Sequence, residues 1–143
     1  MTSRNMAQVT HVLDTSALLA HAFQEPGWER VREILRDEAA VLGLSAAVLF
    51  EFQVRLQEKG VLDQHPDAVA GYESLFDVAI PVDNVVARAA FQLKRDTPQR
   101  LPAMDALIAG CAKTHDAVLV HRDPHIAQIP AHLLKQEVLP PKT

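Results

Sequence analysis

RLPAMDALIAGCAKTHDAVLVHRD, residues 100–123, is the stretch that decides the fold. Between positions 101 and 112 its one charged residue is Asp105, and every other position is apolar, glycine or proline. A helix with so little polar surface has to be packed on most sides. The apolar run that follows, AVLV, has the length and the β-branched content of a buried strand. We therefore expect a buried helix that leads directly into a buried strand.

Three more runs with the composition of strands precede this stretch. The four predicted strands are residues 8–13, 40–44, 77–82 and 117–120, and Pro81 indicates that the third is weakly paired or ends there. Helical patterns lie between the strands. We expect five helices. The first carries an apolar stripe from Trp28, the second has its N-cap at Ser45 and ends at Gly60, and the third begins at Pro66. The fourth has its N-cap at Asp83, and the fifth has Pro102 as its first helical residue.

This alternation of strands and helices predicts a parallel sheet with right-handed crossovers. The fold class that we expect is α/β, a three-layer α/β/α sandwich around a parallel sheet of four to five strands. The 143 residues fit one domain, predicted over residues 1–143 with its core at about residues 8–130. In such sheets ligands bind outside the carboxyl ends of the strands, so the residues that follow each strand are the candidates for chemistry.

The composition indicates a globular protein, since 48% of the residues are hydrophobic and 22% are charged. Residues 1–7 lack the apolar core of a signal peptide, and no apolar run approaches the roughly 18 residues that a membrane span requires. We therefore expect a cytoplasmic protein with no membrane partner. The single Cys111 lies in the apolar stripe LIAGCA and is predicted to be buried and inert.

Asp105 needs an explanation, because a carboxylate among apolar side chains without a partner is strongly unfavourable or takes up a proton. If Pro102 opens the helix, Asp105 lies near the first turn, where the helix dipole stabilises its charge by roughly 0.3 to 1 kcal/mol. That is the plain alternative. The other is a site that Asp105 shares with charged groups from elsewhere in the chain.

Three further acids stand where such a site would form. Asp14 closes the first predicted strand and Asp123 follows the last, although the alternative role of each is a helix N-cap or turn former. Glu51 lies nearly two turns into the helix after the second strand, and its alternative role is an exposed ion pair with Arg55 at i+4. Together with Asp105 these acids come from four segments that the fold would bring to one edge of the sheet.

Such a cluster has a physical requirement. Like charges about 4 Å apart repel by roughly 4 kcal/mol at an effective dielectric constant of about 20, so four carboxylates stay ionised together only with bound cations. Ligand sets made of oxygen alone select Mg²⁺ or Mn²⁺ over zinc. A divalent ion with open coordination positions orients phosphodiesters and activates an attacking water. We therefore expect phosphodiester chemistry with Mg²⁺ or Mn²⁺ as the cofactor.

Four motifs resemble, in order and spacing, the PIN-domain family and especially VapC-like ribonuclease toxins: DTSALL, SAAVLFEF, LPAMDALIAGCA and LVHRDPHIAQIP. The resemblance covers roughly residues 10–130. It implies a PIN-type sandwich in which Asp14, Glu51, Asp105 and Asp123 match the metal-binding acids of the family. It also implies a metal-dependent endoribonuclease, the toxin of a toxin-antitoxin pair, with RNA as substrate, a small antitoxin as partner and a homodimer as assembly.

In this hypothesis the three aspartates hold the ion, and Glu51 completes the ligand set or orients the attacking water. The antitoxin would bind a groove of the early helices, for which the helix of Trp28, expected to be exposed, and the helix of residues 50–56 are candidates. The alternative is a catalytically silent PIN-like module that binds RNA or protein, and the complete set of acids argues against it. A phosphatase with Asp14 as phosphoryl acceptor would need a second acid at the position of Ser16.

The chain departs from the family pattern at two places. His121 stands where such proteins often have Thr or Ser before RD, and Ile126 stands where an aromatic residue often follows, so the role of position 121 stays open. Thr15 or Ser16 is available to supply a hydroxyl near Asp14, although a hydroxyl at a helix start is the plainer role of both.

Two histidines bracket Asp123. Pro124 between His121 and His125 argues against a single helical face, and no Cys or third nearby His completes a zinc site, so zinc is not expected. His125 is instead a candidate to contact the metal's water or a phosphate.

The net charge of −4, from 18 acids and 14 bases, argues at first against a nucleic-acid partner. A bound metal would neutralise the four proposed ligands, which leaves the rest of the chain balanced. RNA binding would then depend on local basic patches. The candidates, whose alternative role is a solvated helix end with favourable C-terminal cations, are Arg88, Lys94, Arg95 and Arg100.

Overall fold

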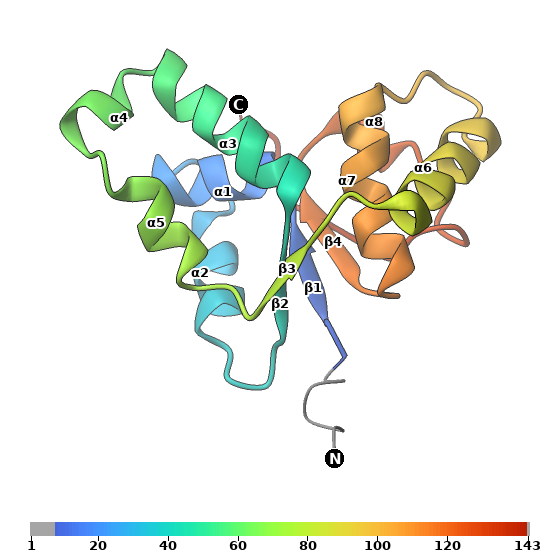
Figure 1. Cartoon of the computed structure of the whole chain (residues 1–143), viewed down its shortest axis with the longest axis horizontal. Helices are drawn as coiled ribbons and strands as arrows, with labels where there is room; N and C mark the ends of the chain where they lie inside the picture. The colour runs from blue at the N-terminus through green and yellow to red at the C-terminus, as the bar shows by residue number, and fades with distance from the viewer. Residues whose placement is uncertain (1–7, 143) are drawn as a thin grey trace.

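The computed structural model describes residues 8–142 and shows one parallel sheet with the strand order β3-β2-β1-β4-β5. The strands are β1 (His11–Leu13), β2 (Leu42–Ser45), β3 (Val78–Ile80), β4 (Val118–His121) and β5 (Gln136–Val138). The helices of this part of the chain are α1 (Thr15–Ala22), α2 (Trp28–Arg36), α3 (Ala46–Glu58), α4 (Val61–Gln64), α5 (Ala68–Glu73), α6 (Asn84–Asp96), α7 (Ala103–Thr114) and α8 (Pro124–Ala127). Figure 1 shows the sheet nearly edge-on, with α1 to α5 along one side and α6 to α8 along the other. The predicted α/β/α sandwich is confirmed.

Three of the four predicted strands are shorter than predicted, the fourth is shifted by one residue, and β5 was not located from the sequence. β1 begins at His11 rather than residue 8, and β2 begins at Leu42 rather than residue 40. The two segments meet first at the Val41 carbonyl, which accepts from the backbone N–H groups of Thr10 and His11 over 2.9 and 3.3 Å. β5 pairs with β4 but has the sequence QEV, which carries no strand pattern. The prediction for residues 1–7 lies outside the described residues.

The helix caps predicted at Ser45 and Asp83 are confirmed. The Ala47 backbone N–H donates to Ser45 Oγ over 3.1 Å, and the Val86 backbone N–H donates to Asp83 Oδ1 over 3.0 Å. α3 ends just before Gly60, whose φ of 74° lies in the left-handed region that favours glycine. These ends are set by local chemistry, which is why the sequence predicts them well.

The two helix starts predicted at prolines were wrong by one or two residues. Pro102 is the N-cap of α7 rather than its first helical residue, because its ψ of 151° is extended. After Pro66, α5 begins only at Ala68, and the short α4 precedes it without having been predicted. A proline marks the approach to a helix without fixing which residue turns first. Asp105 nevertheless lies in the first turn of α7, as expected.

α7 is buried because α6 packs closely against the side that faces away from the sheet. A Cβ atom built on Gly110 of α7 would lie 2.9 Å from the Val86 carbonyl oxygen and 3.0 Å from the Ala90 backbone nitrogen, both in α6. Cys111 is buried, as predicted, and its thiol donates to Ser45 Oγ over 3.3 Å. Helix α7 is therefore held from two sides, and the position of Asp105 is fixed with it.

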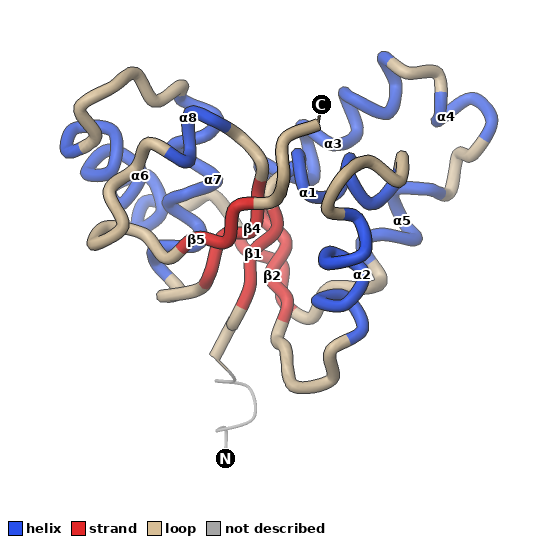
Figure 2. The backbone as a smooth tube through the Cα atoms, turned by 180° about the vertical axis from the view of Figure 1, so that it is seen from behind, coloured by secondary structure: helices blue, strands red, loops and turns tan. Residues whose placement is uncertain are grey.

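The strands are parallel, so their carboxyl ends meet at one edge of the sheet. The opposite views of Figures 1 and 2 both place α1, α3 and α8 around this edge. Asp14, Glu51, Asp105 and Asp123 belong to the segments that begin there. Over residues 8–142, no helix combines the length and the apolar character needed to cross a membrane.

Candidate metal centre

Asp14 follows β1 and is almost fully buried, with 2% of its surface exposed. Its carboxylate caps α1, because Oδ2 accepts from the backbone N–H of Ser16 over 3.2 Å and from the Ser16 hydroxyl over 2.6 Å. The other oxygen, Oδ1, is buried and has no hydrogen-bond partner among the described residues. A buried carboxylate oxygen without a partner is unfavourable. Oδ1 therefore marks a place that a cation or a donor would stabilise.

Ser16 joins the ends of two neighbouring strands. Its hydroxyl oxygen accepts from the backbone N–H of Arg122 over 3.0 Å, so the hydroxyl proton is available to Asp14 Oδ2. This interaction holds the segment after β1 against the segment after β4. Of the two hydroxyls that the sequence offered, Ser16 contacts Asp14, whereas Thr15 Oγ1 is buried without a hydrogen-bond partner in the described part of the chain. Ser16 fixes one carboxylate oxygen of Asp14 and leaves the other unengaged.

Asp123 follows β4 and is the N-cap of α8. Its Oδ1 accepts from the backbone N–H groups of His125 and Ile126 over 2.7 and 3.4 Å. Its own backbone N–H donates to His121 Nδ1 over 3.0 Å. The N-cap role that the sequence left open is therefore real, and it orients the carboxylate at the edge of the sheet.

α7 brings Asp105 next to this turn. One oxygen or nitrogen atom from each of Asp105, Asp123 and His125 lies within 4.8 Å of the others. His125 Nδ1 is 3.5 Å from Asp123 Oδ1 and 3.9 Å from Asp105 Oδ2. The ring of His125, a candidate contact for the metal's water or a phosphate, is close enough to the acids to act as a ligand itself.

Glu51 comes from α3 and is half-buried. The ion pair with Arg55 that was its plain alternative does not form, because Arg55 Nη1 lies 4.0 Å from Glu58 Oε1 instead. The charge of Glu51 raises the pKa of both Asp14 and Asp105. Glu51 therefore acts electrostatically on the same cluster as the three aspartates.

The electrostatics of the cluster are those of like charges held together. Burial raises the pKa of Asp14 to about 6, the hydrogen bonds from Ser16 oppose this, and the charges of Asp123 and Glu51 add to it. Burial also raises the pKa of Asp105 well above its usual range, and the charges of Asp123, Asp14 and Glu51 raise it further. Without a cation Asp14 and Asp105 therefore keep their protons to a higher pH than ordinary carboxyl groups do.

The donors present fit Mg²⁺ or Mn²⁺. Asp105, Asp123 and His125 offer two carboxylate oxygens and one imidazole nitrogen within 4.8 Å of one another. Asp14, with its unengaged Oδ1, and Glu51 do not belong to that group of three. Oxygen-rich sets suit these hard ions, whereas a zinc site would use more nitrogen or sulfur ligands. Asp14, Asp105 and Asp123 would hold such an ion, with His125 and Glu51 beside it.

The basic residues considered for RNA are partly engaged within the molecule. Lys94 Nζ donates to a backbone carbonyl of the loop before α7 over 2.6 Å. Arg95 Nε lies 2.9 Å from Asp96 Oδ1. Arg88 and Arg100 are exposed. The end of α6 thus has, in part, the character of the solvated helix end that was the alternative role of these residues.

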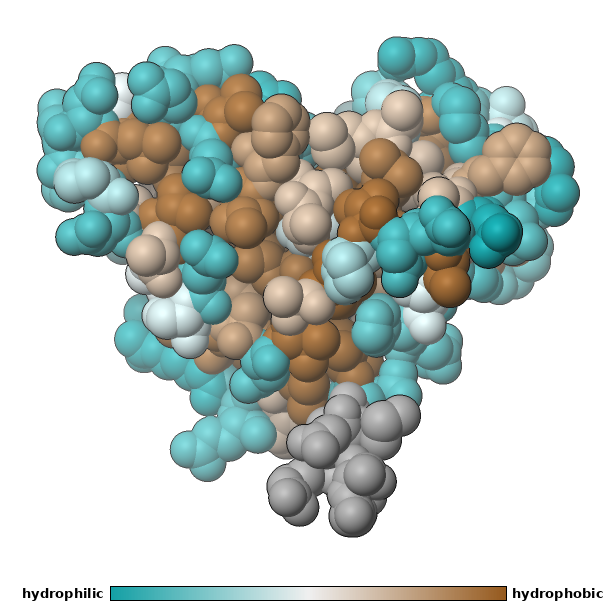
Figure 3. Space-filling view, viewed as in Figure 1, coloured by the Kyte–Doolittle hydropathy of each residue, from teal (hydrophilic) through white to brown (hydrophobic). Residues whose placement is uncertain are grey.

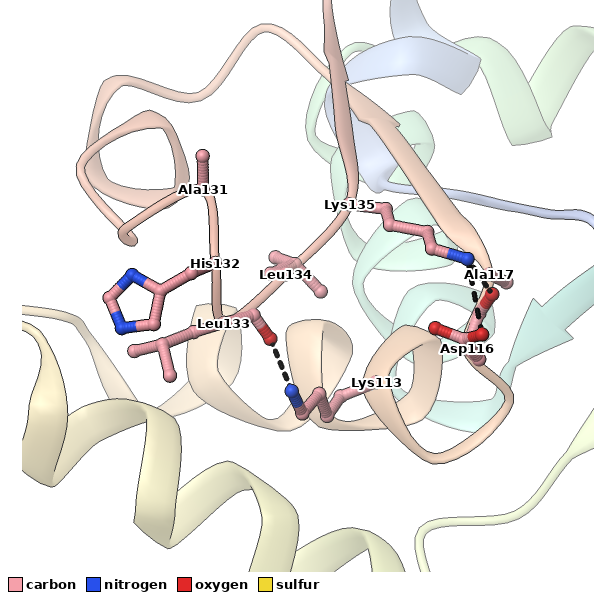
Figure 4. A pocket seen from close by; sticks show the side chains of 8 residues that line it. All are labelled: Lys113, Asp116, Ala117, Ala131, His132, Leu133, Leu134 and Lys135. Carbon is pink, nitrogen blue, oxygen red and sulfur yellow. Dashed lines mark hydrogen bonds and ion pairs between the residues drawn. The ribbon is translucent and has the colours of Figure 1, made fainter.

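A separate cavity of about 200 Å³ lies at the opposite edge of the sheet, among the end of α7, the start of β4 and the loop before β5 (Figure 4). Its two lysines are engaged by neighbours. Lys113 Nζ donates to the Leu133 carbonyl over 2.6 Å, and Lys135 Nζ lies 3.1 Å from Asp116 Oδ2. This cavity holds none of the four acids and is not part of the candidate centre.

Comparison with known proteins identifies the family. The family model for the PIN domain matches residues 11–131, which is most of the chain. The chain belongs to the PIN-domain family. The resemblance inferred from the four motifs is therefore confirmed at the level of the family. No curated protein matches the sequence.

Solved structures share the PIN fold of this chain. A chain of VapBC2 from Rickettsia felis, solved with a DNA fragment from its promoter, has a TM-score of 0.72 at 18% identity, covering 92% of this chain and 100% of that one. A chain of DNA-bound VapBC from Salmonella typhimurium has a TM-score of 0.72 at 20% identity, covering 91% of this chain and 98% of that one. VapC20 from Mycobacterium tuberculosis has a TM-score of 0.65 at 16% identity, covering 82% of this chain and 93% of that one. At such identities the comparison establishes the fold alone.

Proposed function

We propose that this PIN-domain protein is an endoribonuclease that depends on Mg²⁺ or Mn²⁺ and hydrolyses RNA phosphodiester bonds. The observation that carries the proposal is Asp14 Oδ1, a buried carboxylate oxygen without a partner among residues 8–142, together with the raised pKa values of Asp14 and Asp105. VapC20, of the same fold, is described as a toxin that cleaves the sarcin-ricin loop, which supports RNA as the substrate class.

Each residue of the cluster has a role in this proposal. Asp14, Asp105 and Asp123 hold the ion, and Glu51 completes the ligand set or orients the attacking water. When bound, the ion neutralises the acids, polarises the phosphate and lowers the pKa of water. Ser16 and the backbone N–H groups of α8 keep the carboxylates oriented before substrate arrives. The water would displace the leaving oxygen in line at phosphorus.

The proposal includes two protein partners. Several solved chains of this fold come from VapBC or FitAB complexes, and one is described as a toxin-antitoxin complex from Klebsiella pneumoniae. We propose that this chain is likewise the toxin of such a pair. A groove of about 420 Å³ along α3 and α4, lined by Phe50, Val54 and Leu62 among others, would receive the antitoxin. In the other candidate helix, α2, Trp28 is half-buried and Arg32 lies over its ring at 4.7 Å.

A second apolar face is proposed for self-association. β3 is an edge strand, and beside it lies a groove of about 400 Å³ lined by Leu49, Ile80 and Pro81 among others. Val82, just before α6, and Val85, in its first turn, are 39% and 60% exposed. Figure 3 shows hydrophobic side chains gathered over β3 and the adjoining ends of α3 and α6. A homodimer would cover this face.

The proposed activity is tested by cleavage of structured RNAs with and without Mn²⁺. Asp105→Asn removes a charge with little change of shape, so it should abolish Mn²⁺-dependent cleavage, by at least a hundredfold, while the protein stays folded. Its metal-free form should be at least as stable as the wild type, because a repelling charge is gone. Asp63→Asn, on the exposed α4, is the matched control and should cleave at the wild-type rate.

The alternative functions give different results. A silent RNA- or protein-binding module would show no metal-dependent cleavage in any of the three proteins. If Asp105 only served the helix dipole, its replacement would cost under about 1 kcal/mol and leave cleavage unchanged. Either result would contradict the proposal.

A further inference from the structure

His121, the last residue of β4, is fully buried directly beside the candidate centre. Its exposed fraction is 0%. It does not belong to the group formed by Asp105, Asp123 and His125. Its ring instead lies on the far side of the Asp123 turn, between that turn and β5. It therefore contacts the backbone that carries a proposed ligand without reaching the ligand set itself.

The hydrogen bonds around the His121 ring determine which of its two nitrogens carries the proton. Nδ1 lies 3.0 Å from the backbone nitrogen of Asp123, which can only donate, so Nδ1 is the unprotonated acceptor. Nε2 lies 2.8 Å from Gln136 Oε1, so the proton is on Nε2. Gln136 Nε2 donates to the Ile129 carbonyl over 3.0 Å, which fixes the orientation of the amide. All three bonds are satisfied together only in the neutral Nε2–H tautomer.

The backbone of residues 121–123 is held by a bond at each residue. The His121 carbonyl accepts from the backbone N–H of Leu139, the residue directly after β5, over 2.7 Å. The Arg122 backbone N–H donates to Ser16 Oγ over 3.0 Å, and the Asp123 backbone N–H donates to the His121 ring. Of these bonds, the one to the ring is nearest to the Asp123 carboxylate. Losing it would free the turn on the side where Asp123 caps α8.

We propose that His121 is a positioning residue for Asp123: Gln136 of β5 holds it in the Nε2–H tautomer, and its Nδ1 fixes the backbone N–H of Asp123 so that the carboxylate faces the metal. This inference rests on the proposed function, because the proposed function assigns Asp123 as a metal ligand. It also gives β5, an edge strand, a part in the site. Residues that orient metal ligands from behind typically change metal affinity by 10- to 100-fold, roughly, when they are replaced.

Two substitutions of the same residue separate positioning from simple packing. In His121→Asn the amide oxygen stands near the position of Nδ1, so the bond from the Asp123 N–H is kept and the bond to Gln136 is lost. In His121→Gln the longer side chain reaches Gln136 and offers no acceptor at the Nδ1 position. Both variants disturb a buried site. Leu119→Ala, in the core of the same strand, serves as a control that lowers stability without touching these bonds.

The readouts are Mn²⁺ affinity by calorimetry, hydrogen exchange of the Asp123 amide, and the ¹⁵N shifts of the His121 ring. We expect the Nε2–H tautomer in the wild type. His121→Gln should lower the Mn²⁺ affinity at least tenfold, roughly, and expose the Asp123 amide to exchange, whereas His121→Asn should stay within about threefold of the wild-type affinity. Leu119→Ala should lower the unfolding temperature and leave the affinity unchanged. Equal affinities in the two His121 variants, or a proton on Nδ1, would overturn the proposal.

Failure of the proposed function is distinguishable from failure of this inference. A wild type that binds Mn²⁺ and cleaves no RNA would overturn the nuclease, while the affinity comparison still decides the role of His121. A wild type that binds no Mn²⁺ would overturn the metal site, and with it the claim that His121 orients a metal ligand. In that case the tautomer and the exchange of the Asp123 amide, both measured in metal-free protein, still decide whether His121 fixes the turn.

Discussion

The charged groups that act on Asp105 are acids. Burial raises its pKa most, and the charges of Asp123, Asp14 and Glu51 follow. The helix dipole favours its ionised form, because Asp105 lies in the first turn of α7. A dipole contribution of roughly 0.3 to 1 kcal/mol is smaller than the repulsion of roughly 4 kcal/mol between two like charges about 4 Å apart. The dipole therefore does not account for an ionised Asp105, and a bound cation would.

Asp14 makes the stability of the metal-free protein depend on pH. Its pKa is raised by burial to about 6 from an ordinary 3.8. Between these values the folded state holds more protons than the unfolded state, so stability falls as pH rises through this window and stays lower above it. A difference of this size corresponds to about 3 kcal/mol. Urea unfolding of the wild type in a chelator, compared with Asp14→Asn from pH 4 to 7, measures it.

In this comparison the asparagine keeps an acceptor for Ser16, so the cap of α1 is preserved. The variant should gain stability relative to the wild type as pH rises from 4 to 7. Added Mn²⁺ should remove most of that difference, because it stabilises the deprotonated wild-type site. If the difference in unfolding free energy between the two proteins stayed constant from pH 4 to 7, the pKa of Asp14 would not be raised in the folded state.

The individual acids could be named from the sequence, and their connections could not. Asp14 and Asp123 were recognised because they follow apolar runs, and Asp105 because it interrupts one. The hydroxyl of Ser16 reaches the backbone of Arg122 from a distant segment, and no periodicity encodes that contact. The same is true of His121, whose partner lies on a strand that was not predicted.

At the scale of elements, strands and helices were predicted where apolar residues mark a buried face. β4 is largely buried on both sides and was found at its observed length, one residue too early in the chain. β5 is an edge strand with partly exposed polar residues, so its place depends on pairing with β4 rather than on its own composition. α4 is too short to show a helical period, and it was missed for that reason.

The contact between α6 and α7 requires a glycine at position 110. Because a Cβ there would lie 2.9 Å from the Val86 carbonyl oxygen, the helices would have to separate. Gly110→Ala should therefore lower the free energy of unfolding by about 1 to 2 kcal/mol, the cost of overpacking less the gain in helix propensity. Displacement of α7 should also weaken Mn²⁺ binding through Asp105. Chemical denaturation and Mn²⁺ titration measure the two effects.

Gly71→Ala is the matched control for this substitution. Gly71 lies in α5, and a Cβ there would meet no atom within 4 Å. The variant should be more stable than the wild type by about 0.5 to 1 kcal/mol and should bind Mn²⁺ unchanged. If Gly110→Ala also proved stabilising, the close packing of α6 on α7 would not be what holds Asp105.

At the scale of the molecule, the face beside β3 decides the assembly. We expect a homodimer in solution, measured by light scattering after gel filtration. Val85→Glu places a charge on this face, where Val85 is 60% exposed, and should give a monomer. Val138→Glu, on the opposite edge strand, changes a residue that is 56% exposed and should leave the dimer intact. A monomeric wild type, or the same effect from both changes, would contradict the assignment of the face.

The overall architecture was predictable because the alternation of strands and helices nearly determines a parallel sheet. The site was predictable in outline, since parallel strands bring their carboxyl ends to one edge. What the sequence left undetermined is whether four acids from four segments lie close enough to share one ion. That depends on side-chain orientation, which caps and hydrogen bonds such as those of Ser16 and Asp123 set in three dimensions.

The most direct test of the account is a crystal structure of the protein soaked with Mn²⁺, with the ion located by its anomalous scattering. We predict an anomalous peak in contact with Asp14 Oδ1 and with carboxylate oxygens of Asp105 and Asp123. Well-ordered acids without a peak at millimolar Mn²⁺, or a peak only at other residues, would contradict the central claim that these side chains form a metal centre.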